Sequence, residues 1–276
     1  EVYPFETMNA DGDPVVVVGI PGEYTYVGRL LVDFTQDGIV VPESAANELN
    51  GVYASLDEVV NDLYGDADPF AEGSKGELVQ RLTNAVQAVV TAQDGNIIGK
   101  TSVYLEGRRG FVRTEETNLG NLTADANLAI AREFDASVAL SLKNGGGIRA
   151  AIGQVVEVEE GVYVPGPPPA NPEAGKEAGD VSQLDVTNSL RFNNNLTLLT
   201  LTMEELLAVL EHGVAESGPG ATPGRFPQVG GVSFTVDTTR EAGSRIGDVF
   251  LIDENGEPTE QLVDNGEIVT EPDRTV

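Results

Sequence analysis

The sequence predicts a mixed α/β protein of the α+β type, with a mixed sheet flanked by helices. Apolar residues three and four apart alternate along the chain with short β-branched runs, which indicates helices between strands. Hydrophobic residues make up 40% of the 276 positions, enough for the core of one large domain or two modest ones. A layer of strand, helix and strand is typical of this fold class.

The first forty residues contain two predicted strands, a buried one at 15–18 and a second at 26–34. We expect them to be antiparallel edge strands, and two strands are too few for an independent domain. Residues 41–76 form a predicted linker with one short helix that Ser55 caps. The chain begins at Glu1 without a signal-peptide pattern, so we expect a processed chain or a fragment.

Two longer helices follow, each with an apolar face at helical spacing. The first covers residues 77–92, and a strand is expected at 97–105. The second begins at Thr117. The expected inward-facing residues are Leu78, Leu82, Val86 and Val89 in the first helix, and Leu119, Leu122, Ala126, Ala129 and Ile130 in the second.

A predicted strand at 137–143 runs into three consecutive glycines, Gly145 to Gly147. Glycine permits sharp turns and close approach of another group to the backbone. Because Asn144 precedes this turn and Arg149 follows it, the segment is expected to form the wall of a pocket.

Residues 153–183 are rich in proline, glycine and charge, which predicts a surface insertion that is partly polyproline II rather than helix or central strand. Thr202 and Glu205 form a capping box that starts a further helix. The expected inward-facing residues of that helix are Leu206, Leu207, Leu210 and Val214, and the strands expected after it are 232–236, 246–252 and 262–269.

The charge balance excludes several functions. With 45 acidic against 16 basic residues, the net charge of −29 disfavours binding to a nucleic-acid polymer or an anionic membrane surface. No apolar run is long enough to suggest a membrane span. The chain has no cysteine and one histidine, His212, so it cannot build a thiolate site or a histidine-based metal centre.

Arginines stand out in so acidic a chain, because a guanidinium binds phosphate or carboxylate in a bidentate manner. Arg108 and Arg109 are expected to pair with surface acids. Arg113 and Arg149 lie at element boundaries, where a loop pocket would form, and are candidates for an anion site. Phe192 could stack on a flat ring at a pocket mouth or be an ordinary core residue.

Five motifs in order resemble the C-terminal, substrate-binding domain of the 5′-nucleotidase family of bimetal phosphohydrolases. The resemblance covers about residues 70–276, and residues 13–40 resemble the end of the family's metallophosphatase domain. The motifs are T-N-L-G-N-L-T-A-D-A (117–126), N-G-G-G-I-R (144–149), L-R-F-N-N (190–194), L-E-H-G-V (210–214) and G-R-F-P-Q-V-G-G (224–231).

The resemblance implies a domain division and a nucleotide site. Residues 1–40 would be the tail of a metallophosphatase-like domain, 41–76 a linker, and 77–276 a substrate-binding domain truncated at its C-terminus. Arg113, Asn144 and Arg149 would bind the phosphate and sugar side, Phe192 would stack on the base, and Gly146 of the same turn is counted with them. The insertion lengthens the gap between Arg149 and Phe192 relative to animal members.

Two functions follow as expectations. The first is the nucleotide-binding part of a secreted phosphohydrolase at an extracellular, cell-surface or periplasmic location. Its catalytic residues and its two divalent metal ions, zinc or manganese, would belong to the missing N-terminal domain, so this chain itself would bind no metal. The substrate would be a nucleotide or nucleoside. The second is an acidic structural, surface-layer or filament protein that keeps the domain as a scaffold and self-associates.

Overall fold

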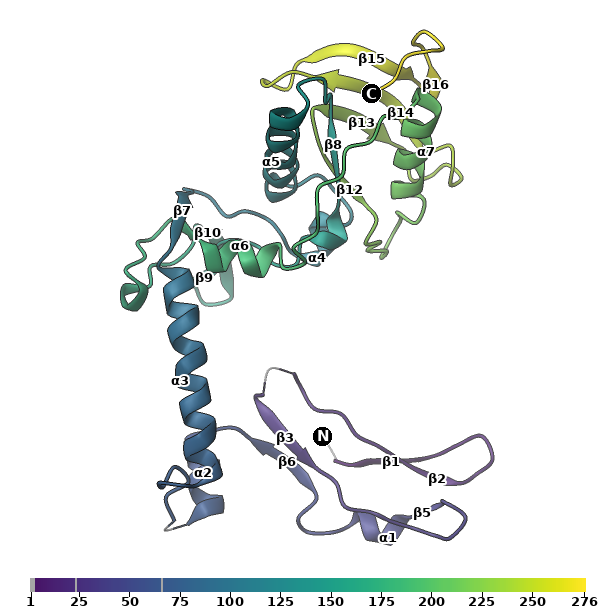
Figure 1. The fold of residues 1–276 in the computed structure, drawn as a ribbon. Coiled ribbons are helices and arrows are strands. Elements are labelled where there is room, and N and C mark those ends of the chain that lie inside the picture. Colours follow the sequence, from purple (N-terminus) through teal and green to yellow (C-terminus); the bar gives the residue numbers. More distant parts are fainter. Residues whose placement is uncertain (1–2, 23, 66) are drawn as a thin grey trace. The chain divides into compact units, whose positions relative to one another are not determined.

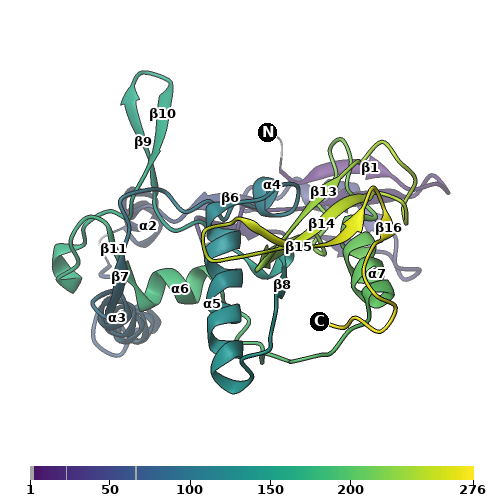
Figure 2. The ribbon, with the colours of Figure 1, turned by 90° about the horizontal axis from the view of Figure 1, so that it is seen from above.

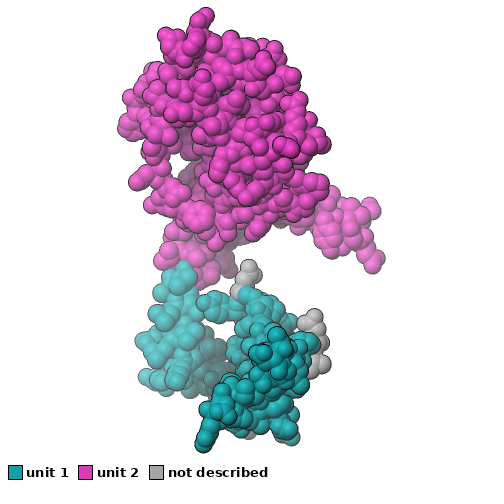
Figure 3. All heavy atoms as spheres, turned by 90° about the vertical axis from the view of Figure 1, so that its right-hand side faces the viewer, with its two compact units in different colours: residues 1–86 teal, residues 87–276 magenta. Residues whose placement is uncertain are grey.

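A computed structural model of the protein describes residues 3–22, 24–65 and 67–276. The chain divides into two compact units, residues 1–86 and 87–276, which are coloured separately in Figure 3. The predicted α+β class is confirmed, because helices accompany several small sheets. The described strand pairs are all antiparallel, so the sheets are not mixed as expected. The domain division expected at residues 40 and 76 stays a prediction.

The first unit consists mainly of short antiparallel strand pairs (Figure 1). Few of its described side chains are buried. β1 pairs with β2, β3 with β6, and β4 with β5. The prediction of a buried strand at 15–18 is wrong, since its valines are half-buried or exposed and Ala45 is the only core hydrophobic residue described in this unit. The elements are β1 Phe5–Met8, β2 Pro14–Val17, β3 Tyr26–Arg29, β4 Asp33–Phe34, β5 Val40–Val41, α1 Pro42–Ala45, β6 Gly51–Ala54 and α2 Asp57–Tyr64.

The predicted cap of the short helix is also wrong. Leu56 is the N-cap of α2, and no side chain caps it. Ser55 instead donates its backbone amide to the carbonyl of Thr25 at 2.9 Å, which extends the antiparallel β3–β6 pair by one bond.

Helix α3, Lys75–Asp94, confirms the prediction of a helix over 77–92. Its predicted apolar face is not covered within the described residues: Leu82 is 69% exposed and Val86 is 62% exposed. The periodic pattern therefore predicts the helix correctly, but which face is buried depends on the rest of the fold.

The segment from 153 to 183, predicted to be an irregular surface insertion, contains regular strands. Its first half is a β-hairpin, β9 Gln154–Glu159 with β10 Val162–Gly166, which extends from the rest of the second unit in Figure 2. Its second half contains β11 Asp180–Ser182, which pairs with β7 Ile97–Lys100. The proline content predicted an irregular loop, but two features give this segment regular structure. The first half contains several β-branched residues, and the second half is held by hydrogen bonds and ion pairs between side chains.

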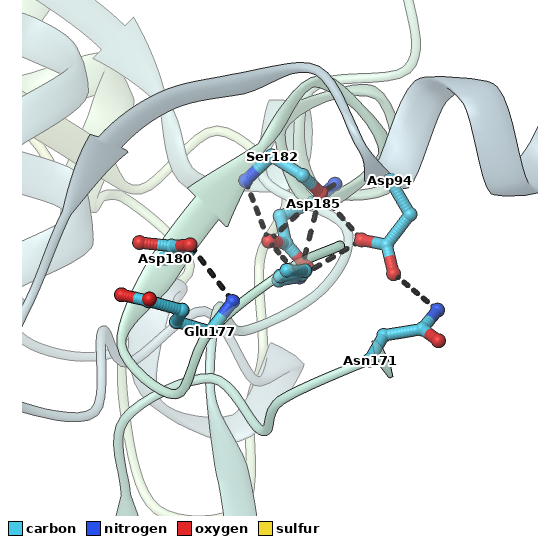
Figure 4. A network of polar contacts seen from close by, with 7 residues as sticks. Asp94, Asn171, Glu177, Asp180, Ser182 and Asp185 are labelled. Carbon is cyan, nitrogen blue, oxygen red and sulfur yellow. Dashed lines mark hydrogen bonds and ion pairs between the residues drawn. The ribbon is translucent and has the colours of Figure 1, made fainter. Parts of the chain in front are cut away.

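Those anchors form the polar network of Figure 4. The Nζ atom of Lys176, a residue only 5% exposed, lies 2.9 Å from Asp94 Oδ1 and 2.7 Å from Asp185 Oδ2. Asn171 Nδ2 donates to Asp94 Oδ2 at 2.8 Å, and Ser182 Oγ donates to Asp94 Oδ1 at 2.7 Å. Since Asp94 is the last residue of α3, the network fixes the end of that helix to the 171–185 segment.

Helix α5, Asn118–Phe134, begins where predicted, with the Thr117 hydroxyl accepting from the Gly120 amide. The expected inward face is mostly wrong: Leu119 is buried, but Leu122, Ala126, Ala129 and Ile130 are exposed. The helix instead packs its small residues inward, which allows β12 to approach closely. Its buried residues are Leu119, Gly120, Thr123, Ala124, Leu128 and Ala131.

The main core lies between helix α7, Met203–Val214, and the sheet β13–β14–β15–β16. The predicted capping box of Thr202 and Glu205 is confirmed. The strand expected at 262–269 is divided into two, because Asn265 and Gly266 adopt positive φ angles of 45° and 87° and turn the chain. The strands are β12 Pro227–Gly230, β13 Val232–Val236, β14 Ile246–Ile252, β15 Pro258–Asp264 and β16 Glu267–Ile268.

Candidate anion-binding site at the glycine turn

The glycine turn is held by three segments that meet around it. Strand β8, Ser141–Asn144, leads into a 3₁₀ turn at Gly145–Gly147. The strand predicted at 137–143 therefore begins later, at Ser141. β8 pairs with β12, and helix α4, Arg109–Val112, lies against the turn.

Glycine is required in this turn because backbone atoms approach it closely. A Cβ atom at Gly145 would lie 1.8 Å from the carbonyl oxygen of Val112, and one at Gly146 would lie 2.7 Å from that of Gly224. The Gly145 amide donates to Phe226 O at 2.7 Å, and the Gly146 amide donates to Gly224 O at 2.8 Å. The turn is thus fastened to the loop that precedes β12.

Apolar packing of the residue that follows the glycines holds the turn in place. Ile148, directly after the glycines, is 2% exposed and packs with Val112 and Leu119 in a second core cluster. The next residue, Arg149, is exposed, and its backbone amide donates to Ser189 O at 2.8 Å. A buried isoleucine thereby fixes the position of a solvent-facing arginine.

Arg113, Asn144 and Gly146 converge on the loop at Thr222–Gly224. Arg113 Nη1 donates to Thr222 O at 3.5 Å, and Asn144 Nδ2 donates to Gly224 O at 3.2 Å. Arg113 is only 9% exposed, and its Nε atom is buried with no hydrogen-bond partner among the described residues. An unpaired buried donor is costly unless another group satisfies it, so this atom is a potential ligand contact.

Arg149 and Phe192 lie together. The guanidinium carbon of Arg149 is 5.5 Å from the centre of the Phe192 ring, within cation–π range. Phe192 is 52% exposed, so the structure favours the exposed stacking position over a core position. The structure therefore brings all five predicted site residues together around the glycine turn, with Arg149 and Phe192 exposed and Arg113 buried.

Positive charge accumulates on this surface. Burial lowers the pKa of Arg113, and the neighbouring charges of Arg109 and then Arg149 lower it further. Among residues 3–22, 24–65 and 67–276, no carboxylate oxygen lies within 4.0 Å of the guanidinium nitrogens of these three arginines. Such an arrangement attracts an anion, because like charges held together are stabilised by a counter-ion.

The expectation that Arg108 and Arg109 both pair with acids is half right. Arg108 forms an ion pair with Glu106 and lies over the Phe111 ring, with 4.4 Å from its guanidinium carbon to the ring centre. Arg109 instead donates from Nε to Thr222 Oγ1 at 3.3 Å. Adjacent residues of α4 thus point to different partners, which residue type alone does not reveal.

Two further contributors were missed from the sequence: the Thr222–Gly224 loop and Gln228. Gln228 is 1% exposed; its Nε2 donates to Val112 O at 3.1 Å and to Glu115 O at 2.8 Å. Its Oε1 accepts from the Thr117 amide at 3.3 Å. The sequence does show a single glutamine within an otherwise apolar strand, which could have indicated a buried hydrogen-bonding role. Its partners could not be identified, because they lie more than a hundred residues earlier in the chain.

The described residues show no group of three or more histidine, cysteine or carboxylate side chains placed to hold a metal ion.

A cavity of about 890 Å³ lies beside the site rather than in it, between α5 and the strands β12 and β13. The outer part of the candidate site is open to solvent, because the side chains of Arg109, Arg149 and Phe192 are exposed. The two arginines give this part positive charge. None of the helices in the described part of the chain combines the length and apolar character needed to cross a bilayer.

An α+β domain with a glycine turn, clustered arginines and an exposed aromatic ring has the features of a domain that binds a small anionic ligand. Comparison with known proteins gives the family. The profile described as "5'-nucleotidase, C-terminal domain" matches residues 97–267. The chain belongs to this family.

Named relatives agree with this assignment. The chain is 30% identical over 258 residues to the trifunctional nucleotide phosphoesterase protein YfkN of Bacillus subtilis, covering 93% of this chain and 14% of that protein. It is 28% identical to the 5′-nucleotidase of Homo sapiens, covering 88% of this chain and 36% of that one. The crystal structure of a 5′-nucleotidase precursor from Thermus thermophilus is similar, with a TM-score of 0.54, 28% identity, and coverage of 94% of this chain and 42% of that one. The chain thus spans less than half the length of each.

Proposed function

We propose that this chain is the nucleotide-binding part of a 5′-nucleotidase-type phosphohydrolase, which hydrolyses phosphate esters of nucleotides. One observation carries the proposal: the five residues lie together around the glycine turn, and its two arginines have no acidic partner among the described residues of a chain whose net charge is −29. Family membership supports the same conclusion, and relatives named as nucleotidases and nucleotide phosphoesterases support the ligand class.

Each side chain has a proposed role that its position supports. Arg113 and Arg149 bind the phosphate and sugar side, since guanidinium groups form charge-assisted hydrogen bonds to phosphate oxygens. Asn144 adds an amide at the same edge, and Gly146 lets the Gly224 backbone approach the turn closely. Phe192 stacks on the base through its exposed ring, a contact available to every nucleobase.

The chemistry itself is assigned to a metallophosphatase-like domain of which residues 1–40 are the proposed tail. The exposed apolar side chains of this region, such as Phe5, Val27 and Phe34, support the idea that a larger domain covers them. Two divalent metal ions, zinc or manganese, would activate water there against the phosphate ester. No described residue of this chain takes part in that step.

We also propose an extracellular, cell-surface or periplasmic location. Relatives that include a snake venom 5′-nucleotidase of Crotalus adamanteus, 30% identical and covering 88% of this chain and 35% of that protein, support it. A strongly acidic surface suits a protein that must stay dispersed outside the cell.

Calorimetric titration of adenosine monophosphate into the full-length protein, with EDTA present to prevent hydrolysis, tests the proposal. The Arg149→Ala variant should bind more weakly by about 1.5–3 kcal/mol, the contribution of a charge-assisted hydrogen bond. Arg240→Ala is the matched control, because Arg240 is an exposed arginine that pairs with Asp237 on the β13–β14 turn. Equal affinity of the wild-type protein and Arg149→Ala would contradict the role of Arg149. Absence of AMP binding to the wild-type protein would contradict the proposed function and favour the scaffold function.

A further inference from the structure

A groove of about 890 Å³ lies beside helix α5 in the second unit, and none of the proposed nucleotide-binding residues lines it. Helix α5, the strands β12 and β13, and the turn at residues 252–256 between β14 and β15 form its lining. Helix α5 packs beside β12, as Figure 1 shows. We call this feature the α5 groove. Its volume is typical of a ligand-binding cleft, and the proposed function leaves it without a role.

The α5 groove is elongated. The helix contributes a row of residues from one of its faces, because most of them are three or four positions apart. From Asn121 to Arg132, the first and last of this row, the helix advances by about 16 Å at about 1.5 Å per residue. A peptide in the extended conformation advances by about 3.3 Å per residue, so about five of its residues match this length. The residues of the row are Asn121, Asp125, Leu128, Ala129 and Arg132.

Apolar side chains in the α5 groove are only partly covered by the described part of the chain. Ala129 is exposed, and Val229, Phe234 and Ile252 are half-buried. Removing such surface from water is favourable in proportion to the area that a ligand covers. A ligand with apolar side chains would therefore gain affinity here that a purely ionic ligand would not.

The charged side chains of the α5 groove are mainly carboxylates. Four exposed acidic residues line it, and no basic nitrogen lies within 4.0 Å of their carboxylate oxygens among residues 3–22, 24–65 and 67–276. The lining arginine, Arg132, already donates to the carbonyls of Val138 at 2.9 Å and Ala139 at 3.2 Å. The groove is thus complementary to a cationic ligand and repels a phosphate. The four acidic residues are Glu116, Asp125, Asp253 and Glu254.

We propose that the α5 groove binds an extended basic peptide segment of a partner protein, in which lysine or arginine residues alternate with apolar residues. Successive side chains of an extended peptide point to opposite sides, so one side can cover the apolar residues while the other reaches the carboxylates near solvent. The length, the apolar lining and the charge of the groove all favour such a ligand over a nucleotide. The inference is independent of the proposed function, because the two sites share no proposed ligand residue.

Fluorescence anisotropy of a fluorescein-labelled peptide of sequence KVKIKVK, titrated with the full-length protein, tests the inference. This peptide should bind at least about tenfold more tightly than KGKGKGK, which has the same charge without apolar side chains. It should also bind at least about tenfold more tightly than EVEIEVE, which has the same apolar residues and the opposite charge. Spermine, an elongated cation without apolar side chains, should displace the labelled peptide less effectively than unlabelled KVKIKVK.

Two pairs of variants locate the binding surface on α5. Ala129→Arg places a bulky cation in the groove and should weaken binding of KVKIKVK at least about tenfold. Ala126→Arg is its matched control, because it adds the same side chain at an exposed position of α5 outside the groove lining, and it should change the affinity less than about twofold. Asp125→Asn should weaken binding about threefold, in the range of an exposed ion pair, whereas Glu133→Gln, outside the lining, should not.

Three results would overturn the inference. Equal affinity for KVKIKVK and KGKGKGK would show general attraction to an acidic protein. Equal effects of the two variants within each pair would place the peptide elsewhere on the molecule. Displacement by spermine as effective as by unlabelled KVKIKVK would identify a polyamine site instead of a peptide site. None of these results would affect the proposed nucleotide site.

Discussion

At the scale of single residues, Gln228 holds the surroundings of Arg113 in place. Its side chain bonds three backbone groups, at Val112, Glu115 and Thr117, and thereby ties β12 to the segment between α4 and α5. Gly120 faces it at a position where a Cβ atom would lie 1.8 Å from Gln228 Oε1. The arginine site thus depends on a neutral side chain that touches no proposed ligand.

Replacing this side chain should destabilise the fold. Gln228→Leu leaves two buried carbonyls and one amide without partners, which we expect to lower the free energy of unfolding by about 2–3 kcal/mol. Gln261→Leu, on the exposed side of β15, should change it by less than about 0.5 kcal/mol. Urea denaturation followed by circular dichroism measures both, and equal midpoints for the two variants would contradict this role for Gln228.

Residue type and position alone identify Arg113, Arg149 and Phe192 as candidates, because arginines at element boundaries and an aromatic residue beside a polar run can be recognised in the sequence. The partners of Arg109 and Gln228 are not predictable in this way. Thr222 lies 113 residues beyond Arg109, and the groups bonded by Gln228 lie 111–116 residues before it. Only the folded chain brings these residues together.

At the scale of elements, local signals predict the starts of α5 and α7, although the predicted Ser55 cap of α2 is wrong. The capping box that starts α7 and the cap of α5 involve residues three apart, so the sequence predicts both helix starts. Whether the apolar face of a helix is buried depends on the elements that pack against it. The predicted inward residues of α3, and Leu122 and Ile130 of α5, are exposed for this reason.

In the 171–185 segment, the buried charge of Lys176 holds together a stretch of chain whose composition predicts an irregular loop. Lys176→Met should lower the free energy of unfolding by about 3–5 kcal/mol at neutral pH, because it leaves the carboxylates of Asp94 and Asp185 without their cation. Arg240→Met breaks the more exposed pair with Asp237 and should change it by about 0–1 kcal/mol. Denaturant titration compares the two variants, and similar small losses in both would contradict the structural role of the network.

The pH dependence of the network follows from two pKa shifts. Burial raises the pKa of Asp94, but the hydrogen bonds from Lys176, Ser182 and Asn171 outweigh burial, and the net pKa lies below the ordinary value of 3.8. Burial lowers the pKa of Lys176, but its bonds to Asp185 and Asp94 outweigh it, and the net pKa lies above 10.5.

A lowered carboxylate pKa stabilises the fold above pH 3.8, and that contribution is lost as pH falls through the lower folded value. A raised ammonium pKa stabilises it below pH 10.5, and that contribution is lost as pH rises through the higher folded value. The stability difference between the wild-type protein and Lys176→Met should therefore be largest between these limits and shrink beyond both. Denaturation series across this range test it, and a difference that does not change with pH would contradict it.

At the scale of the whole molecule, the proposed function assigns ligand binding to this chain and the chemistry to another domain. The proposed ligand groups all lie in the second unit, and the described residues hold no metal-ligand cluster. EDTA treatment of the full-length protein should abolish phosphate release from AMP, while AMP affinity should fall by less than about tenfold if the arginines supply most of the binding energy. Parallel activity and calorimetry measurements test this, and loss of binding together with activity would place the ligand contacts on the metal instead.

The central claim is that the glycine turn and its arginines form a nucleotide site. The most direct test is a crystal structure of the full-length protein with AMP bound. We expect the phosphate within hydrogen-bonding distance of Arg113 and Arg149, and the adenine ring stacked on Phe192. A nucleotide bound elsewhere, with the surface around Gly145–Gly147 empty, would contradict the claim.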